Sequence, residues 1–477
     1  CEAPQVVYEM EHWGTLFSRT KVGRIAQRPF GGAGFPRTCY ASDRTGHNFV
    51  HTLYEQILKR DITVYDEWQV LGLIRAGDLC RGVMAMHTLT GELEAFQSSA
   101  VILATGGYGR IFLRTTNALI NTGSGVAMAY RAGVPLEDME FVQFHPTTLY
   151  GTNILITEGA RGEGGRLLNS RGERFMENYA PTAMELGPRD LVARATQTEI
   201  DQGRGFENEY VLLDLRHLGA EKIDERLPGI RQIAIDFAGV DPVTEAIPIQ
   251  PGQHYSMGGI PTNVNGETVF KGFFAAGECA CVSVHGANRL GGNSLLETLV
   301  FGKRSGKRAA EYVTGLSQRQ GERIFRDSLA KWREKIDSLL KRGGGENPYH
   351  ILEEMKRVMT HQVGIFRQEQ DLQEAVNKLQ ELKERYQKIS IYPKEYAFNR
   401  PLADALELEG MLDVAQVIAV GALARQESRG SHFRLDFPAR DDAKWLKHTL
   451  AAFTPAGPRL SYKDVTITRY RPAERRY

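Results

Sequence analysis

The sequence predicts an α/β fold that also carries a mixed α+β lobe and a C-terminal helical bundle. Residues 100–104 form a buried apolar strand that ends in two glycines, and residues 273–276 form a second one that ends at Gly277. Strands that end in glycines before a helix are typical of the sheet edge across which a nucleotide lies. From about 305 to 430 the pattern becomes helical and rich in charge, which predicts the bundle.

The remaining elements follow from alternation, periodicity and turn residues. Alternating apolar residues on both sides of Thr90-Gly91 predict a β-hairpin. A 3.6-residue period between Leu372 and Tyr386 predicts one helix of the bundle, and the glycines of 343–345 mark a break between helices. In chain order, the expected elements are a helix over 45–60 beginning at Asp43 or Thr45, strands over 62–65 and 69–74, a hairpin of 83–88 and 93–96, a helix from Arg189, and a short strand over 465–468.

Composition describes an ordinary globular protein. The 477 residues are long enough for roughly two to four domains, 42% of them are hydrophobic, and the net charge is only +1. The 59 basic and 58 acidic residues are interspersed, which argues against a nucleic-acid-binding surface. No apolar run approaches the ~20 residues that are needed to span a bilayer.

Five cysteines show no paired Cys-x-x-Cys spacing. We therefore expect a reduced compartment and no iron–sulfur cluster held by this chain. The beginning, Cys1-Glu2-Ala3-Pro4, resembles neither a signal peptide nor an initiation sequence, and we expect that it has been cut.

The stretch from Gln253 to Glu297 combines glycines that allow close backbone approach with groups that suit an anion. Glu278 follows a buried strand, where its carboxylate can accept hydrogen bonds from ribityl or ribose hydroxyls. Ser294 and Glu297 have the spacing of a capping box, and the amides at that helix start suit the edge of a reduced, anionic flavin. Arg289, just before the helix, can bind a carboxylate through two hydrogen bonds. A tight loop before a well-capped core helix is the alternative interpretation.

A second polar stretch, residues 143–165, is rich in glycine and charge. It places His145 in a rigid turn and offers the hydroxyl of Thr157 to a carboxylate. Glu158 and Arg161 are three residues apart, so they pair if the segment turns helically. A buried pair of this kind favours function, because buried charges must be paired, whereas a surface ion pair is the alternative interpretation.

Arg189 stands at the start of a predicted helix, in Gly187-Pro188-Arg189-Asp190. The positive end of the helix dipole repels an arginine there, so the position favours function over stability. The same dipole eases loss of the guanidinium proton, which suits a proton-transfer group. An arginine that pairs with Asp190 or another carboxylate is the alternative interpretation.

His47 and His51 are four residues apart and have the spacing of half a zinc site. No glutamate general base stands between them, and no third ligand is evident. We therefore expect no metal and interpret both histidines as packing against the neighbouring sheet or a cofactor.

Together these motifs resemble the flavoprotein subunit of succinate dehydrogenase and fumarate reductase. The resemblance extends over essentially the whole chain and implies FAD as the cofactor. The matching segments are residues 30–32, 43–47, 104–107, 144–147, 157–165, 254–259, 285–297, 427–432 and 441–445.

The resemblance implies a site for a C4 dicarboxylate beside the flavin. Four residues would hold its two carboxylates and one aromatic ring would pack over it, and a dianion does need several cationic or donor groups. These residues are His145, Thr157, His254, Arg289 and Phe30. Contacts to the flavin are expected from Gly106, Gly107, Ser124, Gly277, Glu278, Ser294 and Leu295, and no metal ligand is expected.

The resemblance also implies a proton path. Hydride would pass between a substrate carbon and flavin N5, and Arg189 would donate or accept the proton. Glu158 and Arg161 would connect Arg189 to solvent, since an arginine loses a proton only transiently and with a relay behind it.

Two features depart from the family pattern. The Gly-x-Gly-x-x-Gly of an N-terminal βαβ unit is absent from the chain, and Ser124 stands where the family usually has an aspartate that contacts the flavin. We therefore expect a Rossmann-like FAD-binding domain without its N-terminal βαβ unit. The expected domains are 1–140 and 254–304 for the FAD-binding domain, 141–253 for a capping domain, 305–432 for a helical domain and 433–477 for a C-terminal tail.

The resemblance finally implies partners. Electrons would pass to an iron–sulfur subunit and a quinone-reactive membrane anchor, at the cytoplasmic face of the inner or plasma membrane. L-aspartate oxidase shares the fold and most motifs, but it usually has Ala-Ser-Asn where this chain has Gly291-Gly292-Asn293. A fragment that cannot retain FAD is the remaining alternative.

Overall fold

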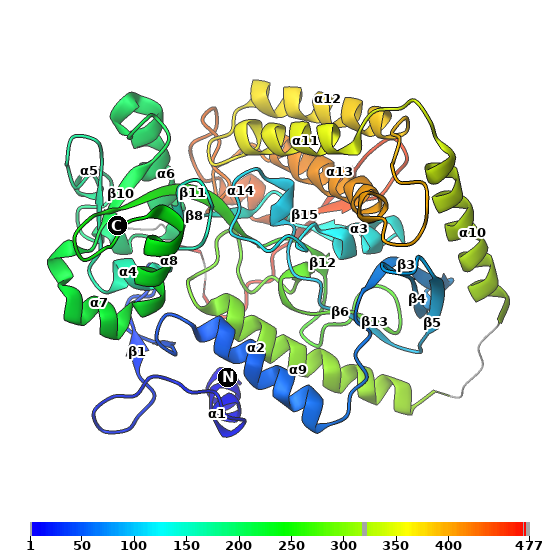
Figure 1. Cartoon of the computed structure of the whole chain (residues 1–477), viewed down its shortest axis with the longest axis horizontal. Coiled ribbons are helices and arrows are strands. Elements are labelled where there is room, and N and C mark those ends of the chain that lie inside the picture. The colour runs from blue at the N-terminus through cyan, green and yellow to red at the C-terminus, as the bar shows by residue number, and fades with distance from the viewer. Residues whose placement is uncertain (1, 317–321, 471, 474–477) are drawn as a thin grey trace.

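The computed structural model describes residues 2–316, 322–470 and 472–473, so Cys1 lies outside the described residues. The predicted α/β class is confirmed, with a mixed lobe at one end and a layer of long helices over the centre (Figure 1). None of the helices that the structure describes is long and apolar enough to cross a membrane.

Two parallel strand pairs form the centre of the chain. β6 pairs with β13, which places Val101 opposite Phe273, and β12 pairs with β14. Both predicted glycine-terminated strands are therefore confirmed, and the chain brings them together after the intervening lobe. The elements are β6 (Val101–Leu103), β13 (Phe273–Ala275), β12 (Ile260–Pro261), β14 (Ala280–Cys281) and the flanking helices α3 (Ser124–Arg131) and α9 (Asn293–Thr314).

A three-stranded antiparallel sheet lies beside this centre and confirms the predicted hairpin. Helix α10 packs on it, and Trp332 approaches so closely that a Cβ on Gly72 would lie 3.0 Å from the indole ring. The predicted strand over 62–65 is wrong, because its apolar side chains are exposed and it has no pairing partner among the described residues. The elements are β3 (Trp68–Ala76), β4 (Leu79–His87), β5 (Leu93–Gln97) and α10 (Glu322–Lys341).

The lobe is a four-stranded antiparallel sheet, in the order β8-β11-β10-β9, with short helices around it (Figure 1). Its apolar cluster, drawn from residues between 149 and 249, is separate from the main core. The domain boundaries stay a prediction. The elements are β8 (Val142–Leu149), β9 (Arg166–Leu168), β10 (Val211–Asp214), β11 (Ile247–Ser256), α4 (Glu158–Gly162), α5 (Met176–Tyr179), α6 (Arg189–Glu199), α7 (Ala220–Arg226) and α8 (Pro228–Ala238).

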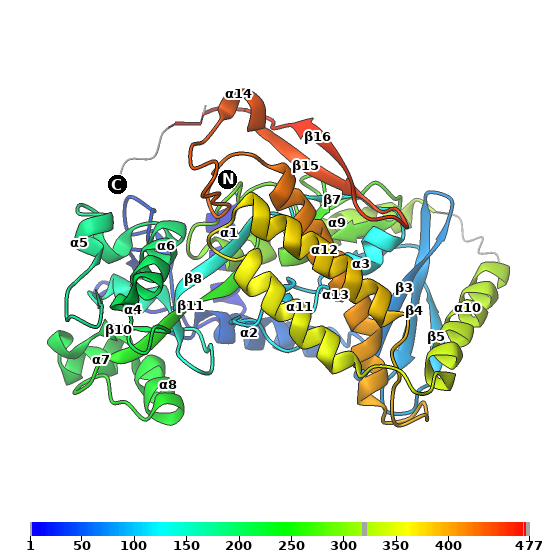
Figure 2. The ribbon, with the colours of Figure 1, turned by 90° about the horizontal axis from the view of Figure 1, so that it is seen from above.

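Three long helices form the predicted bundle, and Figure 2 shows them side by side. The expected apolar face is confirmed, since Leu372, Ala375, Leu379, Leu382 and Tyr386 are all buried, and residues 343–345 do separate two helices. The helices are α11 (Pro348–Gln362), α12 (Glu369–Tyr386) and α13 (Arg400–Ala424).

The C-terminal segment forms a hairpin that returns to the centre of the chain. β15 pairs with β16 on one side and with β7 on the other, so residues near 450 are bonded to residues near 136. The predicted strand over 465–468 is wrong, because β16 ends at Asp464 and no pairing follows it within the described residues. The elements are β7 (Leu136–Glu137), α14 (Asp442–Trp445), β15 (Lys447–Ala452) and β16 (Arg459–Asp464).

The N-terminal segment packs on helix α9. Phe49 of α2 belongs to an apolar cluster with Leu295 and Leu299. Helix α2 begins at Thr45 as predicted, but Asp43 accepts the backbone N–H of Ile230 at 2.9 Å and so caps α8 instead. The elements are α1 (Ala3–His12), β1 (Gln27–Arg28), β2 (Thr38–Cys39) and α2 (Thr45–Lys59), and short 3₁₀ turns cover 109–111, 184–186, 216–218 and 277–279.

Candidate active site

Two histidines face each other where the lobe meets the centre of the chain. His145 lies in strand β8 and His254 in strand β11, with ring centroids 4.9 Å apart. The predicted rigid turn at His145 is wrong, because β8 runs through Pro146 and pairs with β11 along its length. Removal from water, together with the charge of Arg189, holds the pKa of each imidazole well below its usual value. Both rings are therefore neutral at pH 7.

Each histidine uses one ring nitrogen for support. Nδ1 of His145 hydrogen-bonds the backbone of Thr147, and Nδ1 of His254 hydrogen-bonds the hydroxyl of Thr116 at 2.8 Å. Nε2 of His145 is buried and has no hydrogen-bond partner among the described residues. A fixed neutral imidazole with a free nitrogen suits a ligand oxygen.

Glu158 is the carboxylate at the centre of the site. It begins α4, which Thr157 caps by accepting the N–H of Gly159 at 3.2 Å. Glu158 accepts the N–H of Gly31 at 2.5 Å and Nε of Arg189 at 2.7 Å, and Nη2 of Arg161 lies 4.0 Å away. Burial raises the pKa of Glu158, but these cations and the amide outweigh it, so the net shift is downward. The expected Glu158–Arg161 pair is confirmed, and it is buried.

Gln143 joins the two arginines that flank the site. Its side-chain oxygen accepts Nη1 of Arg189 at 3.2 Å and Nη2 of Arg289 at 2.9 Å. Its amide nitrogen donates to Asn288 and to the carbonyl of Arg289, both at 2.7 Å. Gln143 is a site residue that the sequence does not single out, although it lies two positions before His145 on one strand and so shares its face.

Arg289 is buried and carries a free donor. Burial, and next the charge of Arg189, lower the pKa of its guanidinium to about 10. The ring of Tyr255 lies 4.2 Å from its central carbon, which favours the charged form. Nε of Arg289 and both Nε and Nη2 of Arg161 are buried without hydrogen-bond partners among the described residues. A ligand with several anionic oxygens would satisfy these donors.

Phe30, Gly31 and Gly291 form one wall of the site. A Cβ on Gly291 would lie 2.6 Å from the Phe30 ring and 2.7 Å from a carboxylate oxygen of Glu158. A Cβ on Gly31 would lie 2.7 Å from the carbonyl of Gly187. Any larger side chain at either position would collide, so both positions require glycine.

Glu278 lies at the glycine-terminated ends of β6 and β13. It accepts the N–H of Ser256 at 2.8 Å, and burial raises the pKa of its carboxyl to about 7. A Cβ on Gly107 would collide with it, and Gly106 and Gly277 both have positive φ, 69° and 74°. The glycines leave room for a ligand beside this acceptor.

The predicted capping box at the start of α9 is wrong. Gly292, with φ of 81°, precedes Asn293 and caps the helix without a side chain, so Ser294 and Leu295 lie in its first turn. Ser294 instead lies 3.4 Å from Nη1 of Arg289. Glu297 accepts the hydroxyl of Tyr255 and pairs with His285, both at 2.6 Å. The first-turn amides still lack partners within the helix and present its positive end.

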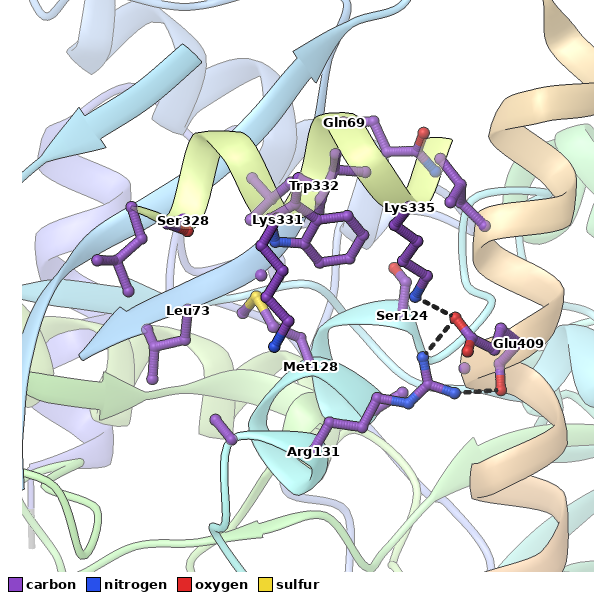
Figure 3. Close-up of a pocket in the computed structure, with 18 of the residues that line it drawn as sticks. Gln69, Leu73, Ser124, Met128, Arg131, Ser328, Lys331, Trp332, Lys335 and Glu409 are labelled. Atoms are coloured by element: carbon purple, nitrogen blue, oxygen red, sulfur yellow. Dashed lines mark hydrogen bonds and ion pairs between the residues drawn. The ribbon is translucent and has the colours of Figure 1, made fainter. Parts of the chain in front are cut away.

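Ser124 lines a different space. It lines a cavity of about 550 Å³ between β3, α3, α10 and α13. Figure 3 shows Ser124 near Lys335. The neighbouring residue that faces the glycine loop is Asn121, since a Cβ on Gly106 would lie 3.2 Å from its side-chain oxygen. The contact of Ser124 with a flavin stays a prediction.

These features fit the flavin end of FAD. Ala104 and Thr105 follow β6 with accessible side chains, the glycine loop leaves room, Glu278 offers an acceptor, and α9 offers free amides. A ribityl chain and an electron-accepting ring need such acceptors, room and a positive helix end. By contrast, His47 and His51 are exposed and join no cluster of three possible metal ligands among the described residues.

Comparison with known families agrees with this geometry. The FAD binding domain family matches residues 1–295, and the fumarate reductase flavoprotein C-terminal family matches residues 352–477. The succinate dehydrogenase flavoprotein subunit of Rickettsia conorii is 46% identical over 98% of this chain and 81% of its own length. The fumarate reductase flavoprotein subunit of Mycobacterium tuberculosis is 46% identical over 100% of this chain and 85% of its own. A quinol fumarate reductase structure from E. coli superposes with a TM-score of 0.95, at 42% identity, over 99% of this chain and 84% of that one.

Proposed function

Because this chain belongs to the FAD-dependent family of succinate dehydrogenase and fumarate reductase flavoprotein subunits, we propose that it interconverts succinate and fumarate with Arg189 as the proton-transfer group. The observation that carries the proposal is the set of buried donors without partners, on His145, Arg161 and Arg289, around one arginine–carboxylate pair. A dianion of four carbons supplies the acceptors that these donors lack.

The substrate is held by groups of two kinds. Arg289 binds one carboxylate through its free Nε, and the neutral imidazoles of His145 and His254 bind the other together with the hydroxyl of Thr157. Phe30 covers the substrate from the wall that Gly291 allows it to approach. Neutral histidines are suited to this role, because a neutral imidazole can donate its N–H to a carboxylate oxygen.

FAD, when bound, supplies the two-electron redox chemistry by exchanging a hydride with the substrate. The residues that would hold its flavin end are Gly106, Gly107, Gly277, Glu278, Ser294 and Leu295, with Ser124 as the predicted further contact. The residues of this chain bind and orient the dicarboxylate, exclude water and move one proton.

Arg189 moves that proton through Glu158. Its Nη2 lies 2.6 Å from a carboxylate oxygen of Glu158, and the same oxygen lies 4.0 Å from Nη2 of Arg161. The three groups therefore form a chain. A proton that leaves Arg189 is accepted by the carboxylate of Glu158, which the charge of Arg161 keeps ionised. Geometry of this kind is what transient deprotonation of an arginine requires.

The wall at Gly291 favours this function over L-aspartate oxidase. Aspartate oxidases usually have alanine at that position, and a Cβ there would press on Phe30 and Glu158. We also propose that the chain works as the flavoprotein subunit of a larger complex, passing electrons to an iron–sulfur subunit and, through a membrane anchor, to quinone. The matched E. coli structure is that of a quinol fumarate reductase.

Two assays on the flavin-loaded protein test the proposal. Succinate should reduce an artificial electron acceptor, and a low-potential dye should drive fumarate reduction, whereas L-aspartate should give no turnover. Arg289→Ala should abolish both activities while the flavin absorbance remains. Full flavin loading without either activity would overturn the proposal.

A further inference from the structure

A second buried cluster of reactive side chains lies away from the candidate active site. It consists of Glu137 at the end of β7, Asp138 directly after it, Cys281 of β14 and His448 of β15. Their exposures are 3%, 6%, 3% and 7%. Two carboxylates, a thiol and an imidazole meet here from three segments that are far apart in the chain.

The ligand atoms of Glu137, Asp138 and Cys281 gather around one point, and the imidazole of His448 lies against the two carboxylates. Sγ of Cys281 lies 3.5 Å from Oε1 of Glu137, and Nδ1 of His448 lies 3.7 Å from the same oxygen and 2.6 Å from Oδ2 of Asp138. The ligand atoms of Glu137, Asp138 and Cys281 all lie within 4.8 Å of one another. Bonds of about 2.0–2.3 Å to a tetrahedral zinc ion place its ligand atoms roughly 3.5 Å apart.

One oxygen of the cluster has no hydrogen bond. Oε2 of Glu137 is buried and accepts no donor among the described residues, and its nearest cation, Nζ of Lys463, is 3.8 Å away. A buried carboxylate oxygen that is left without a donor costs about 1–3 kcal/mol. One carboxylate oxygen of the cluster therefore lacks a hydrogen-bond donor, and a bound cation would satisfy it.

The surroundings fix the ligands in place. The backbone N–H of Thr449 donates to Oδ1 of Asp138 at 3.1 Å, which turns Oδ2 towards the cluster. Asp138 itself has φ of +58°, a left-handed conformation that a side chain rarely adopts unless its surroundings require it. Support from outside the ligand set of this kind is typical of metal sites.

We propose that Glu137, Asp138, Cys281 and His448 form a binding site for one structural zinc ion or a similar borderline divalent cation. A thiolate and an imidazole select zinc over magnesium or calcium, which prefer oxygen ligands alone. On binding, the thiol and the imidazolium each release a proton and the donor atoms contract around the ion. The His448–Asp138 hydrogen bond is then replaced by two bonds to the metal.

The ion would fasten the C-terminal hairpin to the centre of the chain. β15 and β7 are already paired at residues 450 and 137, and Cys281 adds the parallel strand β14 to the same point. The site is separate from the arginines and histidines of the candidate active site. Its loss should therefore lower stability and leave turnover of the folded protein unchanged.

Metal analysis of the intact, flavin-loaded protein tests the site. Purified wild-type protein, freed of loosely bound ions by dialysis, should contain about one zinc per chain by mass spectrometry. Cys281→Ser and His448→Ala should each lower zinc affinity about tenfold or more, the lower end of what changes around zinc ligands cost. Cys279→Ala is the matched control, since Cys279 is buried two positions away and its thiol bonds the backbone carbonyls of Leu103 and Ala276. It should keep the full content.

Two further measurements distinguish this site from other sources of bound zinc. His47→Ala in the wild-type background should leave zinc unchanged, which excludes the exposed histidine pair as its source. Cobalt added in place of zinc should give a sulfur-to-metal absorption band that Cys281→Ser abolishes. Wild-type protein that takes up neither zinc nor cobalt, or a Cys281→Ser variant that binds them equally well, would overturn the proposal and leave an ordinary His448–Asp138 ion pair.

Discussion

The guanidinium groups of Arg189 and Arg289 share one acceptor, the side-chain oxygen of Gln143, at 3.2 and 2.9 Å. Two buried cations so close to one another repel, and the amide dipole of Gln143 is what offsets that repulsion before a ligand arrives. The arrangement leaves the site short of negative charge, because Glu158 pairs with Arg189 whereas Arg289 forms no ion pair with any residue that the structure describes. We propose that a dicarboxylate supplies the missing charge.

Gln143→Leu should weaken dicarboxylate binding without removing any charged group. Losing a hydrogen bond to a charged partner costs about 1.5–3 kcal/mol, so we expect KM for succinate and fumarate to rise about 10- to 100-fold. Steady-state kinetics in both directions measure this. Gln250→Leu is the control, because Gln250 is buried on β11 but its amide nitrogen bonds Asn153, outside the site. Equal KM values in the two variants would contradict the assignment.

Arg189→Lys should abolish turnover while flavin and dicarboxylate still bind. A lysine cannot reproduce both the Nε bond to Glu158 and the Nη1 bond to Gln143, so the proton donor is misplaced. Loss of a positioned acid or base costs about 10²–10⁴ in kcat. Flavin absorbance and the spectral change on adding a dicarboxylate report binding separately from turnover. Arg204→Lys, at a salt bridge with Glu199 in the lobe, should retain activity; near-normal kcat in Arg189→Lys contradicts the proton path.

The sequence predicts local features of this protein better than its long-range ones. Alternation and period located the β4–β5 hairpin, the two glycine-terminated strands and helix α12, because short-range burial sets those patterns. The turn at His145 and the capping box at Ser294 were wrong, since a buried partner strand overrode Pro146 and a left-handed Gly292 replaced the side-chain cap.

Gln143 shows why part of the site escapes such reasoning. An uncharged amide gives no signal in a sequence, and its role depends on two arginines that lie 46 and 146 positions away. Asp43 is a similar case, since its partner Ile230 is 187 positions distant. Charged and aromatic motif residues could be predicted individually. The amide of Gln143, which joins two of them, could be identified only once the fold was known.

Glu278 should make the flavin-free protein less stable as pH rises. Its folded pKa of about 7 lies above the ordinary 4.5, so the unfolded chain releases this proton first. Stability is therefore lost between about pH 4.5 and 7, by an amount on the order of 3 kcal/mol for a shift of this size. Urea unfolding of wild-type protein and Glu278→Gln at pH 5 and pH 8 measures it. The variant should have a higher free energy of unfolding than the wild type only at pH 8. If the stabilities of the two proteins change in parallel with pH, the raised pKa of Glu278 is contradicted.

Gly291→Ala should impair the active site through packing alone. The added Cβ would lie 2.6 Å from Phe30 and 2.7 Å from Glu158, whose carboxylate is fixed by Gly31 and Arg189 and cannot easily retreat. Overpacking of a buried site costs about 1–3 kcal/mol, and displacement of Glu158 by even part of an ångström disturbs the proton path.

The matched control for this substitution is a glycine in helix α9, which begins just after Gly291. Gly302, in the middle of α9, has nothing within 4 Å of an added Cβ. Gly302→Ala should therefore stabilise the protein by up to about 1 kcal/mol, because alanine is the better helix former, and leave kcat unchanged. Thermal unfolding and succinate turnover of both variants separate the two effects. If Gly291→Ala behaves like Gly302→Ala, the site has room for a Cβ at position 291. Gly291 then gives no reason to favour this function over L-aspartate oxidase.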